Sequence, residues 1–138
     1  MIGQPDIAVS LLGETSDCLA RLRDVSRLLC ELEIPHETLC GRDGAQEILT
    51  YAESSERRGI LLIVASSHLS GEFLRRLVAK TLVPVLELRA GAPQEDEALR
   101  LVLTIGSILA LEDLHARGAL EAFRAAHGLE LEPTAAPA

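Results

Sequence analysis

The sequence predicts an α/β fold with three layers, in which helices cover both faces of a doubly wound parallel sheet. Three observations lead to this prediction. The apolar run at residues 7–12 ends at Gly13 and leads into a segment whose apolar residues recur at helical spacing. A second apolar run, residues 60–65, is continuous, as in strands that are buried on both faces. Strand-like and helix-like segments then alternate along the chain, which favours parallel strands joined by right-handed crossovers.

Cap and turn residues set the boundaries of the expected elements. Ser16 or Asp17 would cap the first helix. Pro84 lacks an N–H donor, which indicates either an edge strand or the start of a strand. We expect about four strands in a flavodoxin-like arrangement. The expected strands are residues 7–12, 36–39, 60–65 and 83–88. The first expected helix ends near residue 33, and the other four are expected at residues 45–58, 73–78, 96–111 and 112–127.

Length, composition and charge exclude several classes of protein. A chain of 138 residues with 48% hydrophobic content suffices for one domain, residues 1–128, with a tail at residues 129–138 that we expect to be disordered. Aromatic residues make up only 2% of the chain, so surfaces that stack nucleic-acid bases are missing. The net charge of −8 repels a phosphate backbone, and no segment approaches the length of a membrane span. We expect neither a nucleic acid nor a membrane as a partner.

The cysteines indicate a reducing compartment. Cys18, Cys30 and Cys40 are odd in number and widely spaced, which fits neither a disulfide framework nor a zinc site. The first residues lack the basic region and the apolar core of a signal peptide. We therefore expect a cytoplasmic protein that holds no metal ion and no cofactor.

The candidate site lies at the carboxyl edge of the expected sheet, where open α/β folds bind their ligands. Three loops converge there, at residues 13–17, 40–44 and 66–71. Free backbone N–H groups at the start of the first helix favour an anion such as phosphate. His68 is the only histidine expected on this edge. It suits a general acid or base, because an unperturbed histidine has a pKa of about 6.5.

Motifs in four parts of the chain carry a resemblance to a known family. Residues 13–17 read Gly-Glu-Thr-Ser-Asp, residues 32–36 read Leu-Glu-Ile-Pro-His, and residues 51–54 read Tyr-Ala-Glu-Ser before Arg-Gly at 58–59. The most specific is Ala-Lys-Thr-Leu-Val-Pro-Val-Leu at residues 79–86. These motifs resemble those of the carboxyaminoimidazole ribonucleotide mutase and aminoimidazole ribonucleotide carboxylase family of purine biosynthesis.

The resemblance implies a site, a substrate class and an assembly. It assigns phosphate and ribose binding to Gly13, Ser16 and Asp17, which match the family's Gly-Ser-x-Ser-Asp loop. We expect a small ribonucleotide-like substrate and a homo-oligomer, since the family is typically octameric. The helix at residues 96–111 is apolar over most of its circumference, so we expect it to lie at a subunit interface.

The chain departs from the family at the catalytic positions. Cys-Gly-Arg-Asp at residues 40–43 stands where the family has Ser-Ala-His-Arg, whose histidine transfers the proton. Arg42 stays protonated and would instead clamp a carboxylate or phosphate. The family's Ala-His-Leu-Pro-Gly loop fits in two ways: matching letters aligns it with Ser67 and His68, whereas an ungapped alignment puts Glu72 in the place of the histidine. The family's substrate loop after the last strand is replaced by a short linker at residues 89–94.

Two hypotheses follow from these residues. In the first, the protein is a divergent enzyme that carboxylates, decarboxylates or rearranges an aminoimidazole ribonucleotide or a related carboxylated heterocycle, with His68 or Glu72 handling the proton. In the second, it has lost catalysis and binds a phosphorylated ligand or serves as an assembly subunit.

Overall fold

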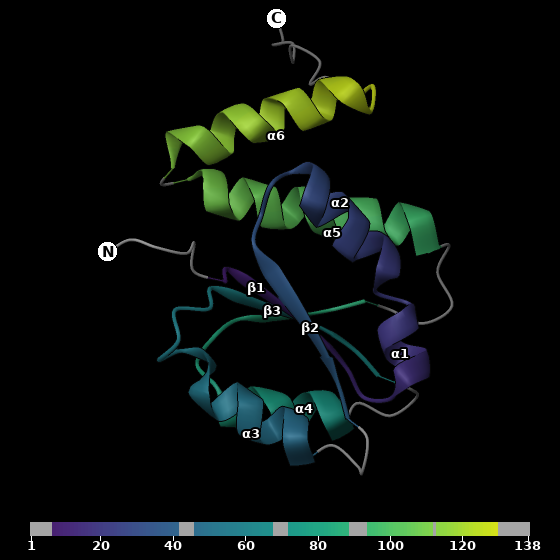
Figure 1. The fold of residues 1–138 in the computed structure, drawn as a ribbon, viewed down its shortest axis with the longest axis vertical. Helices are drawn as coiled ribbons and strands as arrows, with labels where there is room; N and C mark the ends of the chain where they lie inside the picture. Colours follow the sequence, from purple (N-terminus) through teal and green to yellow (C-terminus); the bar gives the residue numbers. More distant parts are fainter. Residues whose placement is uncertain (1–6, 42–45, 68–71, 89–93, 112, 130–138) are drawn as a thin grey trace, which may run out of the picture.

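The computed structural model confirms the predicted α/β fold and describes residues 7–41, 46–67, 72–88, 94–111 and 113–129. Four parallel strands form one sheet at its centre (Figure 1). They are β1 (Val9–Gly13), β2 (His36–Cys40), β3 (Leu62–Ser66) and β4 (Val85–Glu87). Their order is β2-β1-β3-β4, so β4 is an edge strand, and it begins directly after Pro84; both alternatives predicted from this proline therefore apply.

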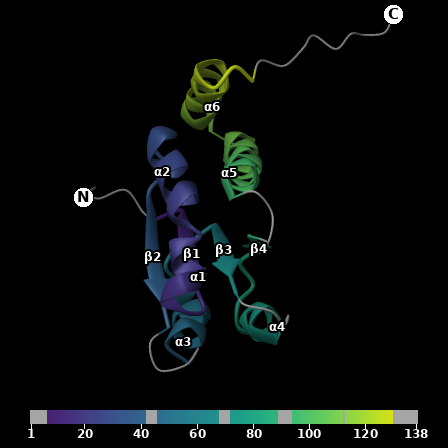
Figure 2. The ribbon, with the colours of Figure 1, turned by 90° about the vertical axis from the view of Figure 1, so that its right-hand side faces the viewer.

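Helices cover both faces of this sheet (Figure 2). On one face lie α1 (Ser16–Ala20), α2 (Arg23–Glu31) and α5 (Gln94–Ala110), and on the other lie α3 (Gln46–Ser55) and α4 (Glu72–Lys80). The last helix, α6 (Leu114–Ala126), packs on α5 on the side away from the sheet (Figure 1). Within the described ranges, no helix has the length and apolar composition needed to cross a membrane.

Strand alternation divides the core into two halves. Leu11 and Val64 belong to the cluster beneath α2 and α5, whereas Leu12 and Ile63 belong to the cluster beneath α3 and α4. All five residues of β3 are buried. A strand covered on both faces needs apolar side chains at every position, which explains the continuous run that the sequence shows there.

The carboxyl ends of three strands lie in register. Gly13 pairs with Cys40 of β2 on one side and with Ser66 of β3 on the other. Two backbone hydrogen bonds continue this register into the loops: the Gly41 N–H donates to the Gly13 carbonyl (3.2 Å), and the Glu14 N–H donates to the Ser66 carbonyl (3.0 Å). The loops that follow these strands therefore start from one edge of the sheet.

The segment after β1 forms two helices rather than the single helix expected from the sequence. Thr15, not Ser16 or Asp17, caps α1, because its hydroxyl accepts a hydrogen bond from the Cys18 N–H (3.2 Å). At the end of α1 the Leu22 N–H donates to the Leu19 carbonyl, three residues earlier. This tighter turn interrupts the α-helical ladder and separates α1 from α2.

α6 packs on α5, the helix for which the sequence predicts a subunit interface. Leu120 and Phe123 of α6 are buried in the same cluster as Val102 and Ile105 of α5. The helices approach closely, since a Cβ placed on Gly106 would lie 2.9 Å from the Leu120 Cδ1. Packing within one chain thus explains much of the apolar circumference of α5.

A polar network attaches the edge strand β2 to α3. The Tyr51 hydroxyl donates to the Glu37 carboxylate and also hydrogen-bonds the buried Ser10 hydroxyl (2.6 Å). The Arg58 Nη2 lies 3.0 Å from the Glu37 Oε2, and its guanidinium lies over the Tyr51 ring. Burial, followed by the hydrogen bond to Glu37, raises the pKa of Tyr51 to about 12. The phenol therefore stays protonated and keeps its donor at neutral pH.

Gly13 has no room for a side chain, so Gly13→Ala should destabilise the fold. A Cβ there would lie 2.5 Å from the backbone nitrogen of Leu19 and 2.6 Å from its Cα. Because α1 would have to move, we expect the free energy of unfolding to fall by about 1–3 kcal/mol in urea titrations.

Gly118→Ala is the matched control for this prediction. Gly118 lies within α6, and a Cβ there would meet nothing within 4 Å. Alanine favours a helix over glycine, so this change should raise the free energy of unfolding by up to about 1 kcal/mol. Equal effects of the two substitutions would contradict the assigned contact between Gly13 and α1.

Candidate functional site

Five of the predicted site residues lie along the carboxyl edge of the sheet. Gly13 ends β1, and Ser16 and Asp17 follow it as exposed residues at the start of α1. Ser67 follows β3 and is buried, and Glu72 begins α4. The structure thus places the loop at residues 13–17 and the entry to α4 after two neighbouring strands, β1 and β3. The other two predicted residues, Arg42 and His68, lie outside the described residues.

Arg21 adds a positive charge that the sequence analysis missed. Its Nη1 donates a hydrogen bond to the Ser67 carbonyl (3.3 Å), so the guanidinium reaches from the end of α1 to the loop after β3. A guanidinium carries five N–H donors in a fixed fork, which suits carboxylate and phosphate groups. Only the break after α1 and the parallel pairing of β1 with β3 bring these residues together, and neither feature is visible as a motif.

Ser66, the last residue of β3, carries an unpaired hydroxyl. Its Oγ is fully buried and is the single buried side-chain polar atom without a hydrogen-bond partner among the described residues. Strand alternation places it on the same face of the sheet as Val64, which is the face that α1 covers. An unpaired buried hydroxyl costs free energy, so it is typical of positions kept for function rather than for stability.

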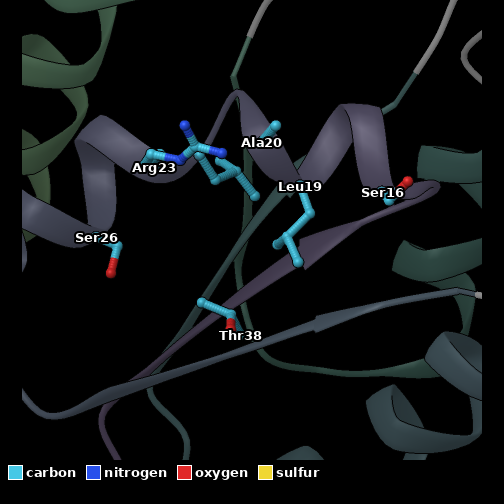
Figure 3. A pocket seen from close by; sticks show the side chains of 7 residues that line it. Ser16, Leu19, Ala20, Arg23, Ser26 and Thr38 are labelled. Carbon is cyan, nitrogen blue, oxygen red and sulfur yellow. The ribbon is translucent and has the colours of Figure 1, made fainter.

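A groove adjoins this edge between the α1–α2 bend and β2 (Figure 3). It has a volume of about 290 Å³, and Ser16 stands at one end with Ser26 at the other. Leu19 points from α1 towards β2, where Thr38 lies (Figure 3). A second cavity of about 410 Å³ continues past Leu19 and Thr38 to Cys40, at the carboxyl end of β2.

These groups define what the edge can do chemically. Arg21 can donate hydrogen bonds to an anionic ligand, whereas the Ser66 hydroxyl is fully buried beside this edge. Asp17 can accept from sugar hydroxyls, and the Glu72 carboxylate can take up or release a proton. Over the parts of the chain that the structure describes, no three His, Cys, Asp or Glu side chains are grouped so that they could hold a metal ion.

Ser66→Ala should leave the folded protein at least as stable as the natural chain. The change removes a buried hydroxyl that has no partner, so we expect the free energy of unfolding to rise by up to about 1 kcal/mol. Urea titration in the absence of ligand measures this difference.

Ser10→Ala gives the matched control, because Ser10 is equally buried but hydrogen-bonds Tyr51. Losing that bond should lower the free energy of unfolding by about 1 kcal/mol. If Ser66→Ala were as destabilising as Ser10→Ala, the Ser66 hydroxyl would have a structural partner, and its assignment to the site would be wrong.

Comparison with known proteins finds a similar fold among solved structures and no match by sequence. No model of a known protein family and no curated protein sequence matches the chain. The fold is similar to the crystal structure of a PurE2 variant from Treponema denticola, with a TM-score of 0.73 and 10% sequence identity. The similarity covers 88% of this chain and 91% of that one. The chain therefore has the fold of PurE2, on a sequence that shares only 10% of its residues with that protein.

Proposed function

We propose that this protein is a divergent member of the carboxyaminoimidazole ribonucleotide mutase and aminoimidazole ribonucleotide carboxylase family. It would carboxylate, decarboxylate or rearrange an aminoimidazole ribonucleotide or a related carboxylated heterocycle in the cytoplasm. One observation carries the proposal. Residues 13–17, which resemble the family's phosphate and ribose loop, follow β1 at the carboxyl edge of a fold shared with PurE2.

The substrate-binding roles fall to groups on α1 and on the loops beside it. Ser16 and Asp17 would hold the phosphate and the ribose, and Gly13 lets α1 approach the strand closely enough to present them. Arg42 supplies a clamp for the carboxylate or phosphate in this proposal. Arg21 is a second candidate for the same task, because its guanidinium already lies against the Ser67 carbonyl.

The proton-transfer role falls to His68 or Glu72. When a carboxyl group leaves an aminoimidazole ring as carbon dioxide, the ring carbon must gain a proton from an acid placed beside it. The family histidine after β2 has no counterpart here. Glu72 begins α4, which follows the loop after β3, so its carboxyl group comes from the same edge as the proposed substrate-binding residues.

The second hypothesis, a protein that binds a phosphorylated ligand without catalysis, is supported by the same departures. Arginine stands at position 42, where the family has its proton-transferring histidine. Only the six residues 88–93 separate β4 from α5, where the family has a substrate loop and a further strand. Turnover measurements separate this hypothesis from the first.

Thermal melting with a panel of ribonucleotides tests binding. Aminoimidazole ribonucleotide or its carboxylated forms should stabilise the protein, by roughly 2.7 kcal/mol at 100 times the dissociation constant, whereas adenosine monophosphate should not. With the ligand identified, His68→Gln or Glu72→Gln should abolish turnover in at least one case, because the proton donor is lost.

Two exposed residues away from the site provide the controls for turnover, His115→Gln and Glu56→Gln. Full turnover in both His68→Gln and Glu72→Gln would overturn the proton-transfer assignment. Ligand-induced stabilisation without any turnover in the natural chain would favour the second hypothesis. Absence of stabilisation by all the aminoimidazole compounds would contradict the proposed substrate class.

We also propose a homo-oligomer, on the basis of apolar side chains around the α5–α6 turn. Leu111 and Leu114 are 74% and 77% exposed, and Ile108 is 42% exposed. Such a group of exposed apolar side chains is typical of a contact surface. Leu114→Asp should lower the molar mass measured by light scattering, because it places a charge in the contact.

Leu82→Asp is the control for this experiment. Leu82 is 83% exposed, but it lies in the turn between α4 and β4, away from the α5–α6 turn. It should therefore leave the molar mass unchanged. A monomeric natural chain, or an assembly that persists in Leu114→Asp, would contradict the proposed contact surface.

A further inference from the structure

We propose that the groove between the α1–α2 bend and β2 is a binding site for a small phosphorylated polyol, separate from the proposed catalytic edge. The groove shares only Ser16 with the predicted substrate-binding residues. Its polar lining comes otherwise from Arg23 and Ser26 of α2 and from Thr38 of β2. Its volume of about 290 Å³ suits a compound of a few carbon atoms with one phosphate group.

Arg23 supplies the positive charge of this groove. Its guanidinium has no ion pair or hydrogen bond with any residue that the structure describes. Arg27, one turn further along α2, lies 3.6 Å from the Asp24 carboxylate and 3.5 Å from the Glu31 carboxylate. The two neighbouring arginines thus differ: one is engaged with its own helix, whereas the other lines a cavity with its donors uncommitted. A guanidinium with uncommitted donors in a cavity favours an anionic ligand at Arg23.

His36 sets the direction of the hydrogen bond at Ser26. The His36 Nδ1 lies 3.0 Å from the Ile34 carbonyl, which only accepts, so the Nδ1 must carry a proton. In the neutral ring the Nε2 is then an acceptor, and the Ser26 hydroxyl donates its hydrogen to it across 2.8 Å. With its hydrogen used in this way, the Ser26 oxygen faces the groove as an acceptor only.

The groove therefore presents two kinds of polar group. Arg23 donates to an oxyanion, whereas the Ser26 oxygen accepts and so requires a donor on the ligand. The Ser16 and Thr38 hydroxyls have no hydrogen bond with any described residue, so each can donate or accept. A phosphate monoester with neighbouring hydroxyl groups satisfies both requirements. An alkyl phosphate satisfies only the first, because it lacks the hydroxyl donor.

Isothermal titration calorimetry of the full chain tests the site with three probes: glycerol 3-phosphate, propyl phosphate and inorganic phosphate. Glycerol 3-phosphate should bind more tightly than the other two. Arg23→Gln should weaken its binding by about tenfold or more, because a charge-assisted hydrogen bond is lost. Arg100→Gln, which changes an exposed arginine on α5, should leave the affinity unchanged.

Ser26→Ala tests the ligand class. Without the acceptor oxygen, glycerol 3-phosphate should lose its advantage over propyl phosphate, while binding of propyl phosphate itself stays the same. Thr38→Val provides a second variant that leaves the hydrogen bond between Ser26 and His36 in place, and it should weaken glycerol 3-phosphate binding in a folded protein. Circular dichroism confirms that each variant is folded.

Asp17→Asn separates this proposal from the proposed function. Asp17 does not line the groove, so the change should leave glycerol 3-phosphate binding intact even where it abolishes ribonucleotide binding. Equal affinity of the natural chain and Arg23→Gln would overturn the proposal. So would a lack of binding by all three probes at millimolar concentration, or tighter binding of propyl phosphate than of glycerol 3-phosphate.

Discussion

The close contact between α1 and the end of β1 is the constraint on which the rest of the site depends. Gly13 leaves no space for a Cβ, so the backbone of Leu19 can approach the strand directly. At the end of the same helix, Arg21 reaches across to the Ser67 carbonyl. Leu19 itself lies between the groove and the cavity that extends to Cys40. The absence of a side chain at Gly13 thus permits the position of α1 beside the end of β1.

Much of the fold follows from local signals in the sequence. The continuous apolar run of β3 predicts a strand covered on both faces. Its side chains alternate between the two apolar clusters on either side of the sheet, so every position must be apolar. Because proline lacks an N–H donor, Pro84 predicts an edge strand or the start of a strand, and β4 is an edge strand that begins directly after it. The division between α1 and α2 was not predictable, since apolar spacing continues through it and only the tighter turn at Leu22 reveals it. The role of α6 in covering α5 was missed because periodicity indicates how much of a helix is buried and not what buries it.

The candidate site was predicted less completely than the fold. Its location follows from the rule that open parallel sheets bind ligands at their carboxyl edge, and Gly13, Ser16, Asp17, Ser67 and Glu72 lie there. Arg21 and Ser66 carry no local signal. The role of Arg21 depends on its hydrogen bond to a carbonyl 46 residues away. Ser66 stands out only because folding buries its hydroxyl without a hydrogen-bond partner. Sequence patterns predict the periodicity and the caps of helices and strands. They do not predict which polar groups will bridge distant segments or be buried without a hydrogen-bond partner, because these depend on the folded structure.

The two edges of the sheet bear on how the protein behaves at high concentration. An open sheet can recruit a strand from another chain along each unpaired edge, which leads to aggregation. β4 offers only three residues, and the proline that precedes it cannot donate a hydrogen bond. β2 is longer, but it carries Glu37, whose charge is held in place by Tyr51 and Arg58. An incoming strand would have to pack beside this fixed ion pair. The network that attaches β2 to α3 thus also protects the exposed side of the sheet from unwanted pairing.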